Sequence, residues 1–308
     1  DSITIQCERG WYHVKKEEGN LFQHVKIIQK DKVVSCDTAY YAAKPPLFTA
    51  RGKVQVEDKQ KKQHLIGDVF YSNKSTGKTY ITGRAIAVQR TEKDSIYLHA
   101  DTLTILEDST GQTIAMKGNK HIKIFSNTLQ AIADSAYYDN INGQLTLAKS
   151  PMIWSKNAQL KGDTIIVFMK DSIINKALII GKASAIMELD SGLFYNQLSG
   201  RKMIAWFEKN ELQRADMNGN AWTILYPIDE IKTDSTLTKK RLGLNRLYAS
   251  DLRVYLDSGE VRSITYFDKP DGIFYPMNQI KEEEKFIVGF EWLVAKRPKD
   301  PYKMVEMD

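Results

Sequence analysis

Apolar and polar residues alternate in short runs along this chain, and one arrangement of them recurs. It consists of an apolar residue, a spacer, a small residue, an acid, further alternating apolar positions and a glycine-containing turn. Clear instances of the small residue and acid are Cys36-Asp37, Gly67-Asp68, Ala100-Asp101 and Gly162-Asp163. Successive acids from Glu8 to Asp163 lie 29, 31, 33, 33 and 29 residues apart. This near-constant spacing predicts one supersecondary unit repeated along the chain.

The periodicity within each unit is two, as in residues 162–168, and β-branched and aromatic residues dominate. This pattern is typical of strands and not of helices. Residues tolerant of positive φ separate the apolar runs at 73–77, 108–111, 142–143 and 257–259. The sequence therefore predicts an all-β fold of stacked antiparallel hairpins, with one repeat domain over residues 1–276.

Strand alternation assigns side chains to two faces. The small residue should share a face with the residues two and four positions later, while the acid points to the other face. Stacked in register, the first face would line a continuous interior. The residues expected there are Val69, Tyr71, Leu98, Ala100, Tyr137, Ile166, Phe168, Ile204, Trp206, Leu252 and Val254. Periodicity alone favours a filled, dry core over an open slot for a ligand.

The repeat pattern is interrupted twice towards the C-terminus. A polar stretch at about 228–246 predicts an exposed loop. At 277–298 the period changes, because Phe286, Phe290 and Leu293 lie at i, i+4 and i+7, and the pattern stops at Pro298. We expect a short C-terminal helix there that caps open strand edges or docks a partner, followed by a tail at 299–308.

Composition and charge narrow the function classes. The net charge of +6 is dispersed, which suits an anionic ligand such as a phosphorylated headgroup. The chain lacks aromatic-interleaved RNA motifs and a basic recognition helix, so we do not expect nucleic acid as a partner. Cys7 and Cys36 occupy the small-residue position of neighbouring units, and either a buried thiol pair or a disulfide fits that placement. The five dispersed histidines and two cysteines lack metal-ligand spacing, so we expect neither metal nor cofactor.

The repeated acids do not resemble a catalytic pair. They recur once per unit, as structural ladder residues do, and no nucleophile-elbow, zinc-protease, phosphate-loop or dinucleotide motif is present. We therefore expect a protein that is not an enzyme. No run of about 18 apolar residues occurs, and the first residues lack the features of a signal peptide. We expect that any signal peptide has been removed.

Several segments together resemble the OstA-like, or LptA-like, proteins of lipopolysaccharide transport, in particular the longer Bacteroidetes-type members. Residues 96–103 look like the family's repeated strand opening, and residues 159–165 look like its later strand with Lys-Gly-Asp. Residues 218–220, 269–276 and 289–298 are similar to the C-terminal half of the longer members. The order of these segments carries the resemblance.

This resemblance implies an elongated, twisted, open β-jellyroll with a V-shaped slot that holds lipid A acyl chains, located in the periplasm of Gram-negative bacteria. The implied partners are lipopolysaccharide or lipid A and other transport components with related β-jellyroll folds, with end-to-end self-association as a further possibility. We thus expect a bridge protein that shelters acyl chains on the interior face during export to the outer membrane. A structural β-solenoid with a dry core, or a carbohydrate-active enzyme, are the alternatives.

Overall fold

The computed structural model describes residues 2–92, 94–110, 112–170, 173–209, 211–233, 236–257 and 260–306. These residues form an all-β, antiparallel structure, which confirms the predicted class. The chain divides into two compact units, Asp1–Leu147 with Pro298–Asp308 and Ala148–Arg297, called unit 1 and unit 2 here. The sequence predicted one repeat domain over 1–276, whereas the structure has a boundary after Leu147.

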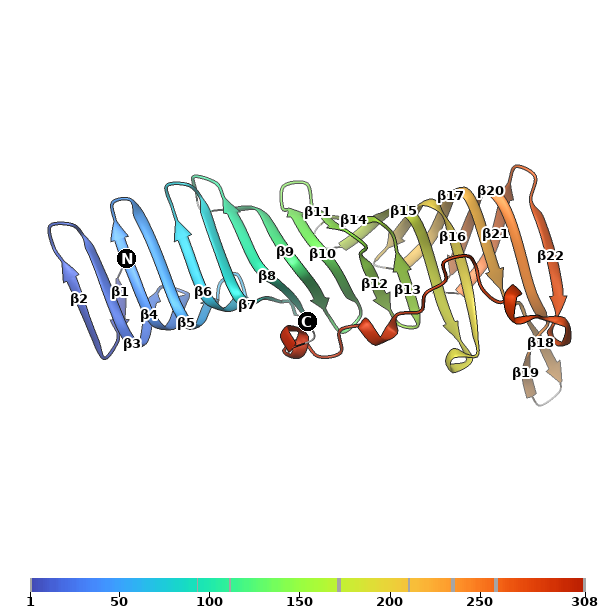
Figure 1. The fold of residues 1–308 in the computed structure, drawn as a ribbon, viewed down its shortest axis with the longest axis horizontal. Coiled ribbons are helices and arrows are strands. Elements are labelled where there is room, and N and C mark those ends of the chain that lie inside the picture. Colours follow the sequence, from blue (N-terminus) through green and yellow to red (C-terminus); the bar gives the residue numbers. More distant parts are fainter. Residues whose placement is uncertain are drawn as a thin grey trace. The chain divides into compact units, whose positions relative to one another are not determined.

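Between residues 18 and 139 of unit 1, consecutive strands pair as antiparallel hairpins and follow one another in chain order (Figure 1). The predicted turns at 73–77 and 142–143 connect strands, as expected; Gly111, in the predicted turn 108–111, lies outside the described residues. The strands are β1 (Ile3–Gln6), β2 (Arg9–His13), β3 (Glu18–Gln29), β4 (Lys32–Ala43), β5 (Pro46–Asp58), β6 (Gln63–Asn73), β7 (Lys78–Arg90), β8 (Ser95–Glu107), β9 (Thr113–Phe125), β10 (Gln130–Asp139) and β11 (Gln144–Ala148).

Unit 2 is also built of antiparallel strands, four of which, β15, β16, β17 and β20, have 15 to 17 residues. Residues 258–259, in a predicted turn, lie outside the described residues. The strands are β12 (Met152–Ser155), β13 (Ala158–Lys161), β14 (Thr164–Lys170), β15 (Ile173–Leu189), β16 (Phe194–Glu208), β17 (Glu211–Leu225), β18 (Ile228–Thr233), β19 (Thr236–Arg241), β20 (Gly243–Asp257), β21 (Glu260–Phe267) and β22 (Asp271–Pro276). A single 3-10 turn, η1 (Asp190–Gly192), joins β15 to β16.

The predicted exposed loop at 228–246 is wrong. Strands β18 and β19 pair in antiparallel register as a separate two-stranded sheet, and β20 begins at Gly243. The alternation of Ile and Thr with charged residues in this segment satisfies strand propensity even though the composition is polar. Polarity here indicates a hairpin outside the main sheet and not the absence of strands.

The predicted C-terminal helix at 277–298 is also wrong. The segment contains only the 3-10 turns η2 (Met277–Gln279), η3 (Glu282–Glu284) and η4 (Val294–Lys296). Gly289 has φ +79°, and the amides of Ile287 and Leu293 donate to glutamine side chains of the sheet instead of to helical carbonyls. The apolar residues therefore pack one by one against strands from an irregular chain. We call residues 280–297 the C-terminal strap.

Every long hairpin has a kink in its middle. The register shifts by one step on β3, β5, β7, β9, β15 and β17, where two successive residues have positive φ. The first residue of this pair is glycine in four of these strands: Gly52, Gly83, Gly181 and Gly219. Such a bulge bends the strand and reverses which face the following side chains occupy. The kink thus divides each strand into two arms, and the alternation of inward and outward side chains shifts by one residue between them.

Candidate functional site

The concave side of each kink carries small, fully buried residues. Val54, Ala85 and Ala100 have no exposed surface, and Gly67 is buried in the same part of unit 1. A Cβ added to Gly67 would lie 2.6 Å from Cγ1 of Ile81, which belongs to the other arm of the neighbouring strand. The arms therefore approach each other so closely at the bend that a neighbouring apolar side chain fills the space above the glycine.

Beyond the kink, unit 1 presents a row of aliphatic side chains that are only half-buried. Antiparallel pairing places them opposite one another across six strands, on the same face as the small buried residues. We call these residues the inner aliphatic row: Ile27, Val34, Val56, Leu65, Ala87 and Leu98. The row continues into Ile124 and Ala131, which are buried. Accessible apolar surface next to a dry bend is what an apolar ligand needs.

Unit 2 repeats this plan with a tighter interior on one arm. Pairing aligns five side chains there, each exposed by at most 2%: Ile165, Ile179, Met203, Met217 and Leu252. On the other arm Leu160, Ala185 and Leu198 lie in one paired row and are half-buried. The inner face of unit 2 is therefore packed on one side of the bend and partly open on the other.

The structure divides the predicted interior residues between the two faces. Leu98, Ala100, Leu252 and Val254 lie on the inner face, and the last three are buried. The remaining seven lie on the opposite, outer face, in rows with Thr, Lys, Arg and Asp: Val69, Tyr71, Tyr137, Ile166, Phe168, Ile204 and Trp206. The bulge after the small residue shifts the alternation by one, so the inner positions are the third and fifth after it, as in Ile165 and Val167.

The outer face is polar and its aromatic rings are covered by cations. The Nζ of Lys176 lies 5.6 Å from the ring centre of Phe168, and the guanidinium carbon of Arg214 lies 3.7 Å from that of Trp206. Tyr71 stacks on Tyr80 with ring centres 4.8 Å apart. These aromatic rings thus make cation–π or stacking contacts with their neighbours on a solvated surface.

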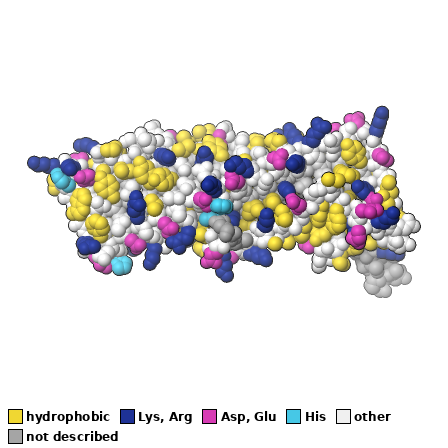
Figure 2. Space-filling view, in the orientation of Figure 1, with side chains coloured by type: hydrophobic (Ala, Val, Ile, Leu, Met, Phe, Trp, Pro, Cys, Tyr) yellow, Lys and Arg dark blue, Asp and Glu magenta, His cyan; other side chains and the backbone are white. Residues whose placement is uncertain are grey.

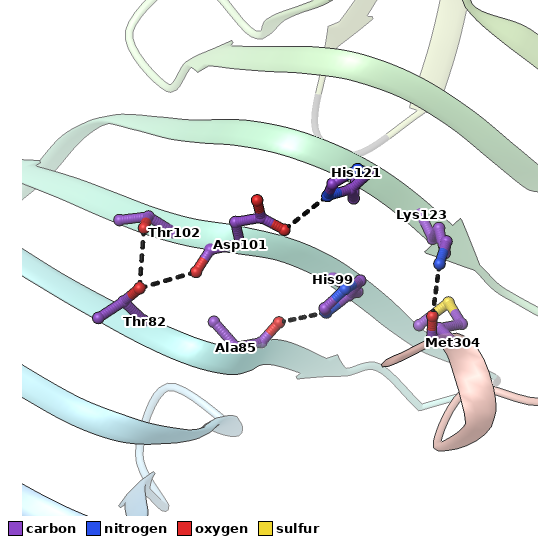
Figure 3. A network of polar contacts seen from close by, with 8 residues as sticks. All are labelled: Thr82, Ala85, His99, Asp101, Thr102, His121, Lys123 and Met304. Carbon is purple, nitrogen blue, oxygen red and sulfur yellow. Dashed lines mark hydrogen bonds and ion pairs between the residues drawn. The ribbon is translucent and has the colours of Figure 1, made fainter. Parts of the chain in front are cut away.

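The repeated acids are held at the kinks. Asp68 accepts hydrogen bonds from Arg84, and Asp101 lies 2.8 Å from Nδ1 of His121, which follows the strand bend on β9 (Figure 3). In unit 2, Asp251 accepts the amide hydrogen of Gly219 at 3.0 Å. Each of these carboxylates therefore binds a basic side chain or a backbone amide of a bulge residue on the neighbouring strand. No group of three or more His, Cys, Asp or Glu suited to a metal occurs in the described part of the chain.

The last described residues cover an outer face of unit 1. Lys123 of β9 donates from Nζ to the carbonyl oxygen of Met304, in η5 (Lys303–Glu306), at 2.7 Å (Figure 3). Tyr302 contacts Tyr97 edge-on, with ring centres 5.6 Å apart. Lys123 and Met304 are buried as a result.

The C-terminal strap covers the corresponding outer face of unit 2 through two buried glutamines. Gln197 donates to the carbonyl of Lys285 and accepts from the amide of Ile287, at 2.7 and 2.9 Å. Gln159 does the same with Glu291 and Leu293, at 2.7 and 2.8 Å. Each side-chain amide thus replaces a strand in pairing with residues i and i+2 of the strap. The sequence analysis missed both glutamines.

The two cysteines are free thiols. Cys36 is buried on the inner face opposite Val25, whereas Cys7 is half-buried between β1 and β2. Burial raises the pKa of the Cys36 thiol to about 11. The structure therefore contains the thiols and not a disulfide. No helix among the described residues has the length and apolarity needed to cross a membrane.

Comparison with known proteins shows which protein family part of this chain resembles. Residues 64–173 match the family model described as "LptA/(LptD N-terminal domain) LPS transport protein". The resemblance to the LptA-like lipopolysaccharide-transport family is thereby confirmed over this part of the chain. The matched region contains most of β6, the whole of β7 to β14 and three members of the inner aliphatic row, Leu65, Ala87 and Leu98.

Several solved structures match this chain, and one of them is similar over part of it. It is the crystal structure of LptH, described as the LptA homologous periplasmic component of the lipopolysaccharide transport device from Pseudomonas aeruginosa. The identity is 12%, the match covers 56% of this chain and 80% of that chain, and the TM-score is 0.19. A likeness of this degree carries no function over to the present chain. No curated protein sequence matches the present chain.

Proposed function

We propose that this protein is a periplasmic lipopolysaccharide-binding transport protein, and not an enzyme, whose inner faces shelter the acyl chains of lipid A on the way to the outer membrane. The observation that supports the proposal is the inner aliphatic row, which is apolar and continuous over six strands and yet only half-buried. The match of residues 64–173 to a lipopolysaccharide-transport family agrees with it.

The energetics of such a site are favourable without any covalent chemistry. Each methylene group that leaves water contributes about 0.8 kcal/mol, so a chain of about 12 carbons would gain roughly 10 kcal/mol. An extended aliphatic surface suits such a chain because the hydrophobic effect is non-directional and tolerates sliding. Directional movement would then come from an energy-consuming partner.

A crosslinking experiment tests the proposal and also distinguishes the two faces. A photoreactive side chain at Leu65 or Leu98, on the inner face, should crosslink to lipopolysaccharide. The same side chain at Tyr71, on the outer face of β6, or at Tyr137, on the outer face of β10, should not. Equal crosslinking from both faces, or none from the inner positions, would contradict the proposal.

The second candidate is a structural β-solenoid with a dry core. It is favoured by the packed inner arm of unit 2, where five aligned side chains are at most 2% exposed. In that case lipopolysaccharide would not crosslink at Leu65, and replacing Leu65 with Asp would lower stability without affecting any binding. No observation favours the carbohydrate-active enzyme, because the repeated acids are engaged at the kinks.

A further inference from the structure

A shallow depression in unit 2 lies between two hairpins, near their tips. The β16–β17 pairing shifts between Trp206 and Phe207 and leaves Gln213 as an extra residue on β17. The β20–β21 pairing shifts at the same level and leaves Arg262 as an extra residue on β21. Because Arg214 pairs with Tyr255 across the two hairpins, the bulges are neighbours. The depression is lined by Gln213, Arg214, Tyr255, Leu256, Arg262 and Ser263.

The polar groups that line the depression can all donate hydrogen bonds, and none is a carboxylate. They comprise two guanidinium groups, a phenol, a hydroxyl and a carboxamide. Guanidinium groups present paired N–H donors in a planar fork that matches the oxygens of a phosphate. Glu211 and Asp257 lie on the same strands nearer the hairpin tips but do not line the depression.

Arg214 is held in place while part of its hydrogen-bonding capacity stays unused. Its guanidinium lies over the ring of Trp206, and its Nε is buried without a hydrogen bond, 3.3 Å from Oδ1 of Asp216. Asp216 is already engaged by Arg253, whose Nε and Nη2 donate to its two oxygens at 2.8 Å each. One carboxylate therefore faces two guanidiniums, and Arg262 adds a third positive charge beside them.

We propose that this depression binds a phosphate monoester. The surplus of positive charge, the paired guanidinium donors and the absence of a lining carboxylate all favour a compact dianionic oxyanion over a neutral or cationic ligand. Two sources supply this chemistry, a phosphorylated lipid headgroup and free phosphate.

Arg214 pairs with Trp206 and with Tyr255, so the depression lies on the outer face, near the tips of the two hairpins. Ala215 and Val254, which pair with each other directly next to Arg214 and Tyr255, are buried inner-face residues. A lipid whose phosphate occupies the depression would therefore have to pass around the hairpin tips for its acyl chains to reach the inner face of the same strands. This headgroup assignment rests on the proposed function, whereas the binding of phosphate itself rests only on the site.

The test is a binding titration of the full chain at fixed ionic strength, since exposed charges are screened by salt. The probes are inorganic phosphate, lipid A and lipid A from which the phosphates have been removed. Arg262→Gln removes one exposed guanidinium with little risk to folding, and Arg201→Gln, an exposed arginine of β16, is the matched control. A hydrogen bond to a charged group contributes enough that Arg262→Gln should weaken phosphate binding about tenfold, and the control should not.

The outcomes separate the site from the proposed function. Weaker binding of both inorganic phosphate and lipid A in Arg262→Gln, with dephosphorylated lipid A unaffected, supports the site with the lipid headgroup as its ligand. Weaker binding of inorganic phosphate alone supports the site with free phosphate as its ligand. If inorganic phosphate binds equally to Arg262→Gln and to the unaltered chain, the site is excluded. Failure of dephosphorylated lipid A to bind any variant counts only against the acyl-chain proposal.

Discussion

At the scale of single residues, the kink decides which side chains face inward. Position 162 requires a glycine because an added Cβ would lie 2.5 Å from the rigid Cγ2 of Ile179 and clash with it. Leu98 and Ala100 precede the kink, and simple alternation placed them correctly. Val69 and Phe168 follow a kink, and alternation placed them on the wrong face because it takes no account of an extra residue in the strand.

Cys36 makes the stability of the fold depend on pH in alkaline solution. Burial raises its pKa from 9.0 to about 11, so the native state keeps the thiol proton in a range where the unfolded chain releases it. The free energy of unfolding should then fall by about 2 kcal/mol as the pH rises from 9 to 11, and this contribution should be constant below pH 9. Urea unfolding of the protein at a series of pH values measures this slope.

The Cys36→Ala variant serves as the control for that slope. Tyrosines and lysines also titrate in this range, but they are the same in both proteins. The variant should therefore lose stability less steeply between pH 9 and 11. Parallel slopes would show that Cys36 is not the cause.

At the scale of elements, the C-terminal strap shows that glutamine side chains can form the backbone hydrogen bonds that a neighbouring strand would otherwise form. The apolar spacing of Phe286, Phe290 and Leu293 predicted a helix, yet Phe286 and Phe290 pack on Tyr195 from an irregular chain. The sequence offered no signal for this arrangement, because the partners of the strap, Gln159 and Gln197, lie about a hundred residues away and look like ordinary polar strand residues. The strands, whose pairing is local, were predictable.

Removing one of these glutamines should release part of the strap. Gln197→Leu eliminates the hydrogen bonds to Lys285 and Ile287 and leaves two backbone groups without partners. At about 1 kcal/mol for each hydrogen bond, the local free energy of opening should fall by about 2 kcal/mol. Hydrogen exchange of the strap amides should accelerate accordingly.

Gln279→Leu is the matched control for the strap. Gln279 is exposed at the end of η2, before the strap begins, so its replacement should leave exchange unchanged. Unchanged exchange in Gln197→Leu as well would mean that packing of Ile287 and Phe290, and not the glutamine, holds the strap.

At the scale of the whole molecule, the N-terminal end of unit 1 carries two exposed strands. β1 and β2 both pair with β3, on opposite sides of its kink, and all their residues are exposed. Ile5 and Trp11 are about half exposed, and apolar side chains gather over this end in the space-filling view (Figure 2). Exposed strands with apolar side chains favour edge-to-edge pairing with another sheet. The expected partner is a second copy or a related β-jellyroll.

Charges on these strands should weaken such pairing. The double variant Ile5→Lys with Trp11→Lys places lysines on both edge strands, and lysines on an edge disfavour pairing. Sedimentation velocity should show less concentration-dependent association than in the unaltered protein. Association that persists at the same concentration would place the contact elsewhere.

The strap also bears on how an incomplete chain would behave. The side chains that the strap covers are at most 1% exposed, and the strap is synthesised after the strands that carry them. These side chains are Trp154, Gln159, Gln197 and Ile224. A polypeptide that stopped before residue 280 would form the strands of unit 2 but leave two glutamines and an apolar surface facing water. Such a product would be prone to aggregation and to proteolysis. The outer face of unit 2 thus becomes a stable surface only after the strap has been synthesised.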